Sequence, residues 1–186
     1  STLPRPSYPT KIVQSWDVAM QTGETNDYSV CTTWRADRDD VYLLHVSRGR
    51  HEYPELRRKV LALAHEHACD RVLIEDAGPG MNLLQDLRHS PTPGTLRPIG
   101  VRPEGGKLER MASQTAKIEA GHVHLPENAP WLGEFLAELL AFPNGRHDDQ
   151  VDSVSQFLLW WQRENFQFNV PFVMPFYTSQ PRNLPS

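Results

Sequence analysis

The stretch Arg71-Val-Leu-Ile-Glu-Asp76 is a short apolar run that ends in two acids. A run of this length suits a strand buried on both faces, as in a parallel sheet that helices cover on each side. A carboxylate beside such a strand is costly to desolvate unless it lies at the strand end, next to a cleft. The stretch therefore predicts an α/β domain with Glu75 at the edge of a cleft.

Strand patterns come before this stretch, and helices alternate with strands after it. Strands are predicted over residues 11–18, 28–35, 41–47, 71–74, 96–101 and 123–125. Helical spacing of apolar residues predicts helices over 53–68, 78–88, 106–120, 131–141 and 147–162. The predicted fold is α/β, with a central mixed sheet flanked by helices. The sheet would join an antiparallel three-strand meander to parallel strands.

The two ends of the chain differ from the middle in composition. Three prolines mark residues 1–10 as an extended lead-in, and prolines and aromatic residues crowd residues 165–186. We therefore predict a folded domain over 11–164 between a linker and an irregular tail. No apolar run approaches the roughly 20 residues that span a bilayer, so no membrane contact is expected.

Two further acidic segments accompany Glu75. Asp17 ends the first predicted strand, and His147-Asp-Asp-Gln-Val-Asp152 begins the last predicted helix. Asp148 and Asp149 are four and three residues from Asp152, so these carboxylates share a helix face and repel each other. Bound Mg²⁺ or Mn²⁺ would relieve this repulsion. The alternative for each residue is ordinary: Asp17 as a turn former, Asp148 and Asp149 as helix caps, His147 as a surface or capping residue.

The segment from Gly105 to Pro126 contains Lys107-Leu-Glu-Arg110, then Glu119-Ala-Gly121, then Val123-His-Leu-Pro126. It resembles the Lys-x-x-Arg helix and following strand of the nuclease domain of phage terminase large subunits, in the RNase H-like superfamily. Trp16-Asp17 with Asn26–Ser29 resembles that family's first hairpin. Ile74-Glu75 with Gly78 and Gly80 resembles its second acidic segment, and His147–Ser153 its closing helix. The resemblance covers about residues 11 to 163.

This resemblance implies an RNase H-like, metal-dependent endonuclease that cleaves double-stranded viral DNA during genome packaging. It implies two Mg²⁺ or Mn²⁺ ions about 3.5–4 Å apart that straddle the scissile phosphate. The implied catalytic ligands are Asp17, Glu75 and Asp149, with Asp152 and then Asp148 as further candidate metal ligands. Asp27 and His147 are implied to support the site without binding an ion directly.

Basic residues near the family-like helix are candidates for DNA contact. Lys107, Arg110 and Lys117 fall close to one face of a continuous helix over 106–120, and Arg102 and Arg97 extend the same rim. Such contacts to the backbone carry little sequence information and weaken as salt rises. The alternative is an ordinary solvated helix face.

The resemblance also implies partners and a location. The expected partners are double-stranded DNA, an upstream ATPase domain joined through residues 1–10, the portal and the small terminase subunit, at the procapsid in the host cell cytoplasm. The chain has no GxxxxGK[ST] phosphate loop, so it is not expected to hydrolyse ATP by itself. Two alternatives stay open: a junction resolvase or integrase-type enzyme on the same fold, and a non-catalytic module that grips DNA or the portal.

Overall fold

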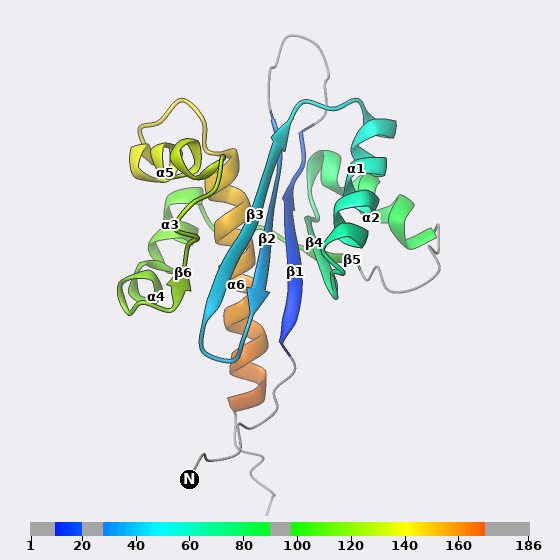
Figure 1. Ribbon diagram of the computed structural model, residues 1–186. Coiled ribbons are helices and arrows are strands. Elements are labelled where there is room, and N and C mark those ends of the chain that lie inside the picture. The colour runs from blue at the N-terminus through cyan, green and yellow to red at the C-terminus, as the bar shows by residue number, and fades with distance from the viewer. Residues whose placement is uncertain (1–9, 20–27, 90–97, 170–186) are drawn as a thin grey trace, which may run out of the picture.

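The computed structural model of the chain describes residues 10–19, 28–89 and 98–169, with side chains as far as residue 165. A six-stranded sheet has the order β5-β4-β1-β2-β3-β6 (Figure 1). Its strands are β1 (Lys11–Asp17), β2 (Ser29–Ala36), β3 (Val41–Gly49), β4 (Arg71–Glu75), β5 (Pro98–Val101) and β6 (Val123–His124). The first three pair antiparallel, and β4, β5 and β6 join in parallel. The predicted mixed sheet is confirmed.

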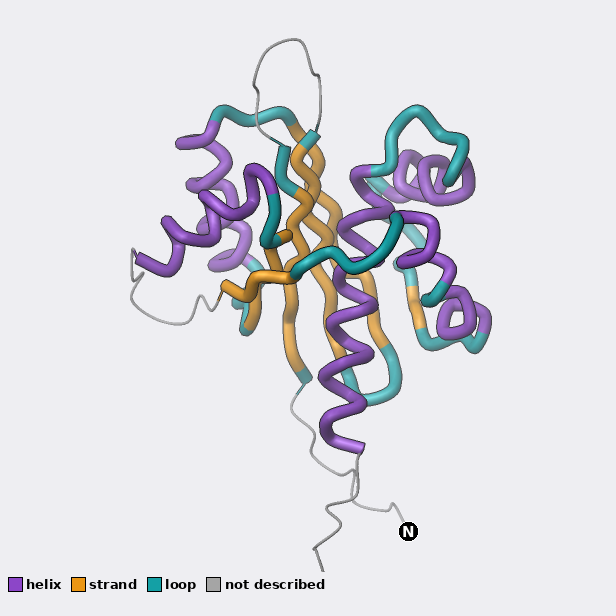
Figure 2. The backbone as a smooth tube through the Cα atoms, turned by 180° about the vertical axis from the view of Figure 1, so that it is seen from behind, coloured by secondary structure: helices purple, strands orange, loops and turns teal. Residues whose placement is uncertain are grey.

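Helices cover both faces of the sheet. They are α1 (Tyr53–Glu66), α2 (Gly78–His89), α3 (Lys107–Ala112), α4 (Thr115–Glu119), α5 (Leu132–Ala141) and α6 (Asp149–Asn169). Buried residues of α1 and α2 form one core with the sheet, and those of α5 and α6 form the other. Figure 2 shows α6 running along the sheet, on the side away from α1. Among the described residues, no helix is both long and apolar enough to cross a membrane.

Alternation along the strands assigns side chains to the two cores. Val13 of β1 and Leu73 of β4 pack in the α5–α6 core, whereas Trp16 and Ile74 pack in the α1–α2 core. Side chains two residues apart on a strand point to the same face. Odd-numbered positions at the ends of β1 and β4 therefore face α6.

The predicted helix over 106–120 is wrong in one respect, because two short helices, α3 and α4, replace it. At the break, the Ser113 hydroxyl donates to the Arg110 carbonyl at 2.7 Å, and the fully buried Gln114 donates to Ser113 Oγ at 2.8 Å. Such local side-chain bonds compete with the helical backbone pattern. Gly121, at φ +81°, follows α4 as expected.

The last helix is longer than the prediction. It continues to Asn169, beyond the predicted helix end at 162 and into the predicted tail. No glycine or proline interrupts the sequence from Asp149 until Pro171, so nothing local stops the helix earlier. The linker at residues 1–9 and the tail from residue 170 lie outside the described residues.

Candidate active site

Two acids end neighbouring strands on the face that α6 covers. Strands β1 and β4 run parallel, with Trp16 opposite Ile74, so Asp17 and Glu75 follow at adjacent strand ends. By strand alternation both side chains point toward α6, on the side of Val13 and Leu73. The two acids that the sequence predicted at strand ends therefore lie at the same edge of the sheet.

A polar interface seats α6 against this part of the sheet. The hydroxyls of Ser15 and Ser153 each donate to the other residue's backbone carbonyl at 2.8 Å. Ser153 Oγ also lies 2.7 Å from Thr32 Oγ1, and Gln156 Nε2 donates to Ser15 Oγ at 2.9 Å. Small side chains allow a close approach, and the bonds fix the helix in rotation and in register. The first turn of α6 is thereby placed beside the strand ends.

A pocket of about 170 Å³ lies where these elements meet, and Asp17, Glu75 and Asp152 all line it. Asp152 is held there by α6, and its side chain is only 12% exposed. Arginines also border the pocket: Arg102, Arg110 and Arg163. The arrangement combines clustered carboxylates with a basic rim.

Burial and neighbouring carboxylates raise the pKa of two acids in the pocket, Asp17 and Glu75. Burial, followed by the charges of Asp152, Glu75 and Asp149, raises the pKa of Asp17 well above its ordinary value, and Lys107 offsets only part of this. Burial and then Asp152 also raise the pKa of Glu75. Clustered carboxylates of this kind are short of positive charge. A divalent cation would supply that charge.

Two basic side chains of α3 contact the acids near the start of α6, Asp148 and Asp152. Lys107 Nζ lies 2.6 Å from Asp152 Oδ2 and 2.8 Å from Asp148 Oδ1, and Arg110 Nη2 lies 2.9 Å from Asp152 Oδ1. Burial lowers the pKa of Lys107, but hydrogen bonds to the two aspartates outweigh it, so the pKa lies above its ordinary value. In this arrangement, protein cations neutralise part of the acidic cluster.

The pocket residues suit a hard divalent ion by donor chemistry, since Mg²⁺ and Mn²⁺ prefer carboxylate oxygens. Within the described residues, however, no group of three or more His, Cys, Asp or Glu side chains is already arranged to hold a metal ion. Lys107 and Arg110 contact both carboxylate oxygens of Asp152. By chemistry, the carboxylates of Asp17, Glu75 and Asp152 that line the pocket fit a divalent ion.

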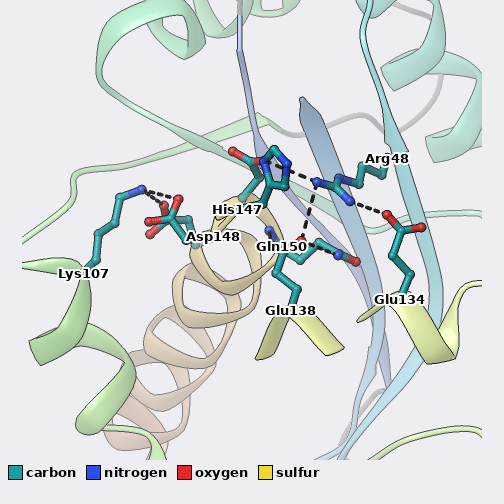
Figure 3. A network of polar contacts seen from close by, with 9 residues as sticks. Arg48, Lys107, Glu134, Glu138, His147, Asp148 and Gln150 are labelled. Atoms are coloured by element: carbon teal, nitrogen blue, oxygen red, sulfur yellow. Dashed lines mark hydrogen bonds and ion pairs between the residues drawn. The ribbon is translucent and has the colours of Figure 1, made fainter. Parts of the chain in front are cut away.

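Asp149, at the start of α6, contacts a second group of residues around Arg48, which lies near Glu134 and His147 in Figure 3. Its Oδ2 is 3.9 Å from Nη2 of Arg48, and Arg48 Nη2 is also 3.7 Å from Oε2 of Glu138. Arg48 further contacts Glu134 and stacks over Tyr28, with its guanidinium carbon 4.0 Å from the ring centre. Burial and then Glu138 raise the pKa of Asp149, and Arg48 opposes them.

Glu138 also completes the start of α6. Its two carboxylate oxygens accept hydrogen bonds from the backbone N–H and the side-chain amide of Gln150, each at 2.7 Å. The first N–H groups of a helix lack partners within the helix, so an acceptor from α5 satisfies one of them. This contact fixes the end of α6 that carries the acids.

A sequence model of the terminase RNaseH-like domain matches residues 14–160. The chain belongs to the terminase RNase H-like domain family. No match was found among curated protein sequences.

Solved structures with the same fold include viral nuclease domains and a resolvase. The large terminase nuclease of thermophilic phage G20c with bound zinc is 20% identical, with a TM-score of 0.60 and 79% of each chain covered. The Mn-soaked human cytomegalovirus terminase nuclease domain is 10% identical, with a TM-score of 0.56, covering 85% of this chain and 87% of that one. The fowlpox virus resolvase with Holliday junction DNA is 15% identical, with a TM-score of 0.55, covering 82% and 98%. These likenesses establish the RNase H-like fold.

The terminase domain brings most of the predicted acids together. Asp17, Glu75 and Asp152 share the pocket, while Asp148 pairs with Lys107 beside it. The sequence-based order placed Asp149 first among the helix acids, whereas the pocket lining favours Asp152. Which acid is essential stays a prediction.

The other predicted residues are more dispersed. His147 Nδ1 is 4.0 Å from Asp149 Oδ2, which is compatible with the predicted supporting position. Arg102 lies at the pocket, 3.5 Å from Asp76. Lys117 is not on one helix face with Lys107, because it belongs to α4 and lies over the Trp161 ring at 4.9 Å. Asp27 and Arg97 lie outside the described residues.

Some residues of the site were missed from the sequence. Gln156 is four residues after Asp152, so helical spacing places it on the same face, and that signal was available. Arg163 lines the same pocket from farther along α6. Arg48 and Glu138 gave no local signal, because their roles depend on β3 and α5 meeting the start of α6.

Proposed function

We propose that this terminase domain is a divalent-metal-dependent endonuclease that cleaves double-stranded DNA during viral genome packaging. The observation that carries the proposal is the convergence of Asp17, Glu75 and Asp152 on one pocket. The pKa values of Asp17 and Glu75 are raised by burial and by neighbouring acids, which is the electrostatic state that a bound cation relieves. Family membership supports the same function.

The proposed ion ligands are Asp17, Glu75 and Asp152, with Asp149 at the start of α6 and Asp148 just before it as further candidates. Two Mg²⁺ or Mn²⁺ ions would supply Lewis-acid activation of water and would stabilise negative charge at the phosphate. The zinc-bound and Mn-soaked relatives support a divalent ion in general.

The chain's own residues contribute alignment and DNA binding. The bonds from Ser15 and Gln156 hold α6 against β1, so Asp152 keeps its position relative to Asp17. Arg102 and Arg163 border the pocket and can pair with backbone phosphates on either side of the scissile bond. Because such pairs release counterions, DNA affinity should fall steeply with salt.

The direct test is plasmid cleavage in Mn²⁺ by Asp17→Asn, Glu75→Gln and Asp152→Asn. Each substitution removes a carboxylate but keeps the side-chain shape, so cleavage should fall at least about 100-fold while the circular dichroism spectrum is unchanged. Glu127→Gln, an exposed acid outside the pocket, is the matched control. Wild-type cutting rates in all three pocket variants would refute the proposal.

A junction resolvase is the second candidate, favoured by the likeness to the fowlpox virus resolvase. Comparing cleavage of four-way junctions with that of linear duplexes separates the two enzymes. A non-catalytic module that grips DNA or the portal would leave both substrates intact, whether or not it binds Mn²⁺ in calorimetry.

The proposal extends to the setting of the reaction. It includes an upstream ATPase domain, the portal and the small terminase subunit as partners, at the procapsid in the host cytoplasm. Family membership supports this setting. Co-purification with a portal protein and a small subunit is the corresponding measurement.

A further inference from the structure

Both carboxylate oxygens of Asp152 are occupied by cations of the same chain. Lys107 Nζ is 2.6 Å from Oδ2, and Arg110 Nη2 is 2.9 Å from Oδ1. Lys107 also contacts Asp148 at 2.8 Å, as Figure 3 shows. An ammonium group at this distance takes one acceptor position of that oxygen, and its positive charge repels a divalent ion beside it. Metal binding to Asp152 is therefore expected to compete with Lys107.

The helix that carries Lys107 has few constraints on its movement. None of the six residues of α3, all of them described, is buried, and Leu108 is 58% exposed. Gly105, in the left-handed region at φ +72°, precedes the helix, and the break at Ser113 follows it. Contacts with α6 at Asp148 and Asp152 are thus a main anchor of α3.

The two cations of α3 differ in their freedom. The Lys107 side chain is 49% exposed, whereas that of Arg110 is 13% exposed. Arg110 also donates to the Gly105 carbonyl at 3.1 Å, which holds it in place. Lys107 is therefore the less constrained of the two cations.

We propose that Lys107 is an internal counter-ion that occupies the acidic cluster until a divalent ion displaces it, and that it then pairs with a DNA phosphate. The inference rests on the proposed function, and it adds that metal and DNA bind cooperatively. An ammonium group released beside bound DNA gains a charge-assisted bond to phosphate. Because coupling between two ligands is reciprocal, DNA that draws Lys107 away must raise metal affinity by the same factor.

The first experiment is calorimetric titration of Mn²⁺ into the wild type and Lys107→Met without DNA. Removal of the competing ammonium should tighten Mn²⁺ binding about tenfold, within the usual range of such coupling. Lys107→Arg keeps a cation at this position and should bind Mn²⁺ close to the wild-type affinity. Arg58→Met removes one positive charge from the exposed side of α1, across the sheet, and controls for net charge.

The second experiment repeats the titration with a short phosphorothioate duplex, whose integrity is checked on a gel. The duplex should raise Mn²⁺ affinity of the wild type about fivefold or more and leave that of Lys107→Met nearly unchanged. Thermal melting establishes that each variant is folded. If Lys107→Met does not fold, Lys107→Gln serves as a second uncharged variant.

The outcomes separate this inference from the proposed function. Equal or weaker Mn²⁺ binding by folded Lys107→Met, with cleavage by the wild type intact, overturns the counter-ion role alone. If Lys107→Met binds Mn²⁺ without DNA and the wild type does not, the result supports the counter-ion role. Absence of Mn²⁺ binding in both proteins overturns the counter-ion role and the metal-dependent nuclease together.

Discussion

Two acids on the first turn of α6 are neutralised by different cations: Asp152 on the pocket side, and Asp149 on the side of Arg48. On the pocket side, Asp152 meets Lys107 and Arg110 from α3, a helix without buried residues. On the other side, Asp149 and Glu138 meet Arg48, which extends from β3 and is 15% exposed. The pocket side combines the half-exposed Lys107 with the largely buried Arg110, whereas the other acids meet the largely buried Arg48.

The difference separates two tasks. The buried side holds the end of α6, because Glu138 accepts two hydrogen bonds from Gln150 while Arg48 balances its charge. On the pocket side, the proposed exchange of Lys107 for a metal ion would change the charge balance. A substitution on the buried side should therefore affect stability, and one on the pocket side should affect binding and cleavage.

The largest expected effect is on cleavage. Asp152→Asn should reduce plasmid cutting in Mn²⁺ at least about 100-fold, because it removes a pocket carboxylate. Asp149→Asn should reduce it less, since Asp149 is engaged with Arg48 outside the pocket lining. Initial rates of nicking measure both, and the opposite order would break the comparison between the two sides.

The next effect is on stability, from Arg48→Met. Loss of this buried cation leaves Glu138 and Asp149 without their countercharge and should cost about 3 kcal/mol of unfolding free energy. Lys107→Met, which removes an exposed ion pair, should cost less than about 1 kcal/mol. Chemical denaturation measures the unfolding free energy of both variants. Similar losses would mean that Arg48 and Lys107 contribute equally to stability.

A smaller loss is expected for Glu138→Gln. The amide oxygen can accept one of the two hydrogen bonds from Gln150, so the helix start keeps part of its cap, and the cost should be about 1 kcal/mol. Glu134→Gln is the matched control, because Glu134 is 69% exposed and contacts the same Arg48. A cost for Glu134→Gln as large as that for Glu138→Gln would place the main contribution in the ion pair and not in the cap.

The smallest effect, and one of opposite sign, is expected for Asp17→Asn without metal. Because the folded-state pKa of Asp17 is raised, its ionisation destabilises the fold, and this penalty grows as pH rises above the unfolded-state pKa of about 3.9. Below that pH both states are protonated and the penalty vanishes. Asp17→Asn should therefore melt above the wild type at neutral pH in EDTA, and the difference should disappear near pH 3.

Thermal melting across this pH range, with and without Mn²⁺, tests the sign. Bound Mn²⁺ should reverse the order of the two proteins, because the ion pairs with ionised Asp17 and stabilises the wild type. A wild type more stable than Asp17→Asn in EDTA at neutral pH would contradict the electrostatic account of the pocket.

Much of this domain could be predicted from local patterns. The apolar run before Glu75 and the alternation leading to Asp17 place both acids at strand ends, since strand geometry repeats every two residues. The local pattern was misleading over residues 106–120. In this segment, helical spacing continued through Ser113 and Gln114, although the chain forms two short helices. There, side-chain hydrogen bonds and burial of Gln114 outweighed helical periodicity.

By itself, the sequence determined the order of strands and helices, the terminase-like motifs and the strand-end positions of Asp17 and Glu75, because these depend on residues close along the chain. Only the tertiary structure decided which helix acid lines the pocket and which cation neutralises it. Lys107 and Asp148 are 41 residues apart, and Arg110 and Asp152 are 42 apart. Contacts at such separations depend on how α3 and α5 pack against α6, and no local periodicity encodes that packing.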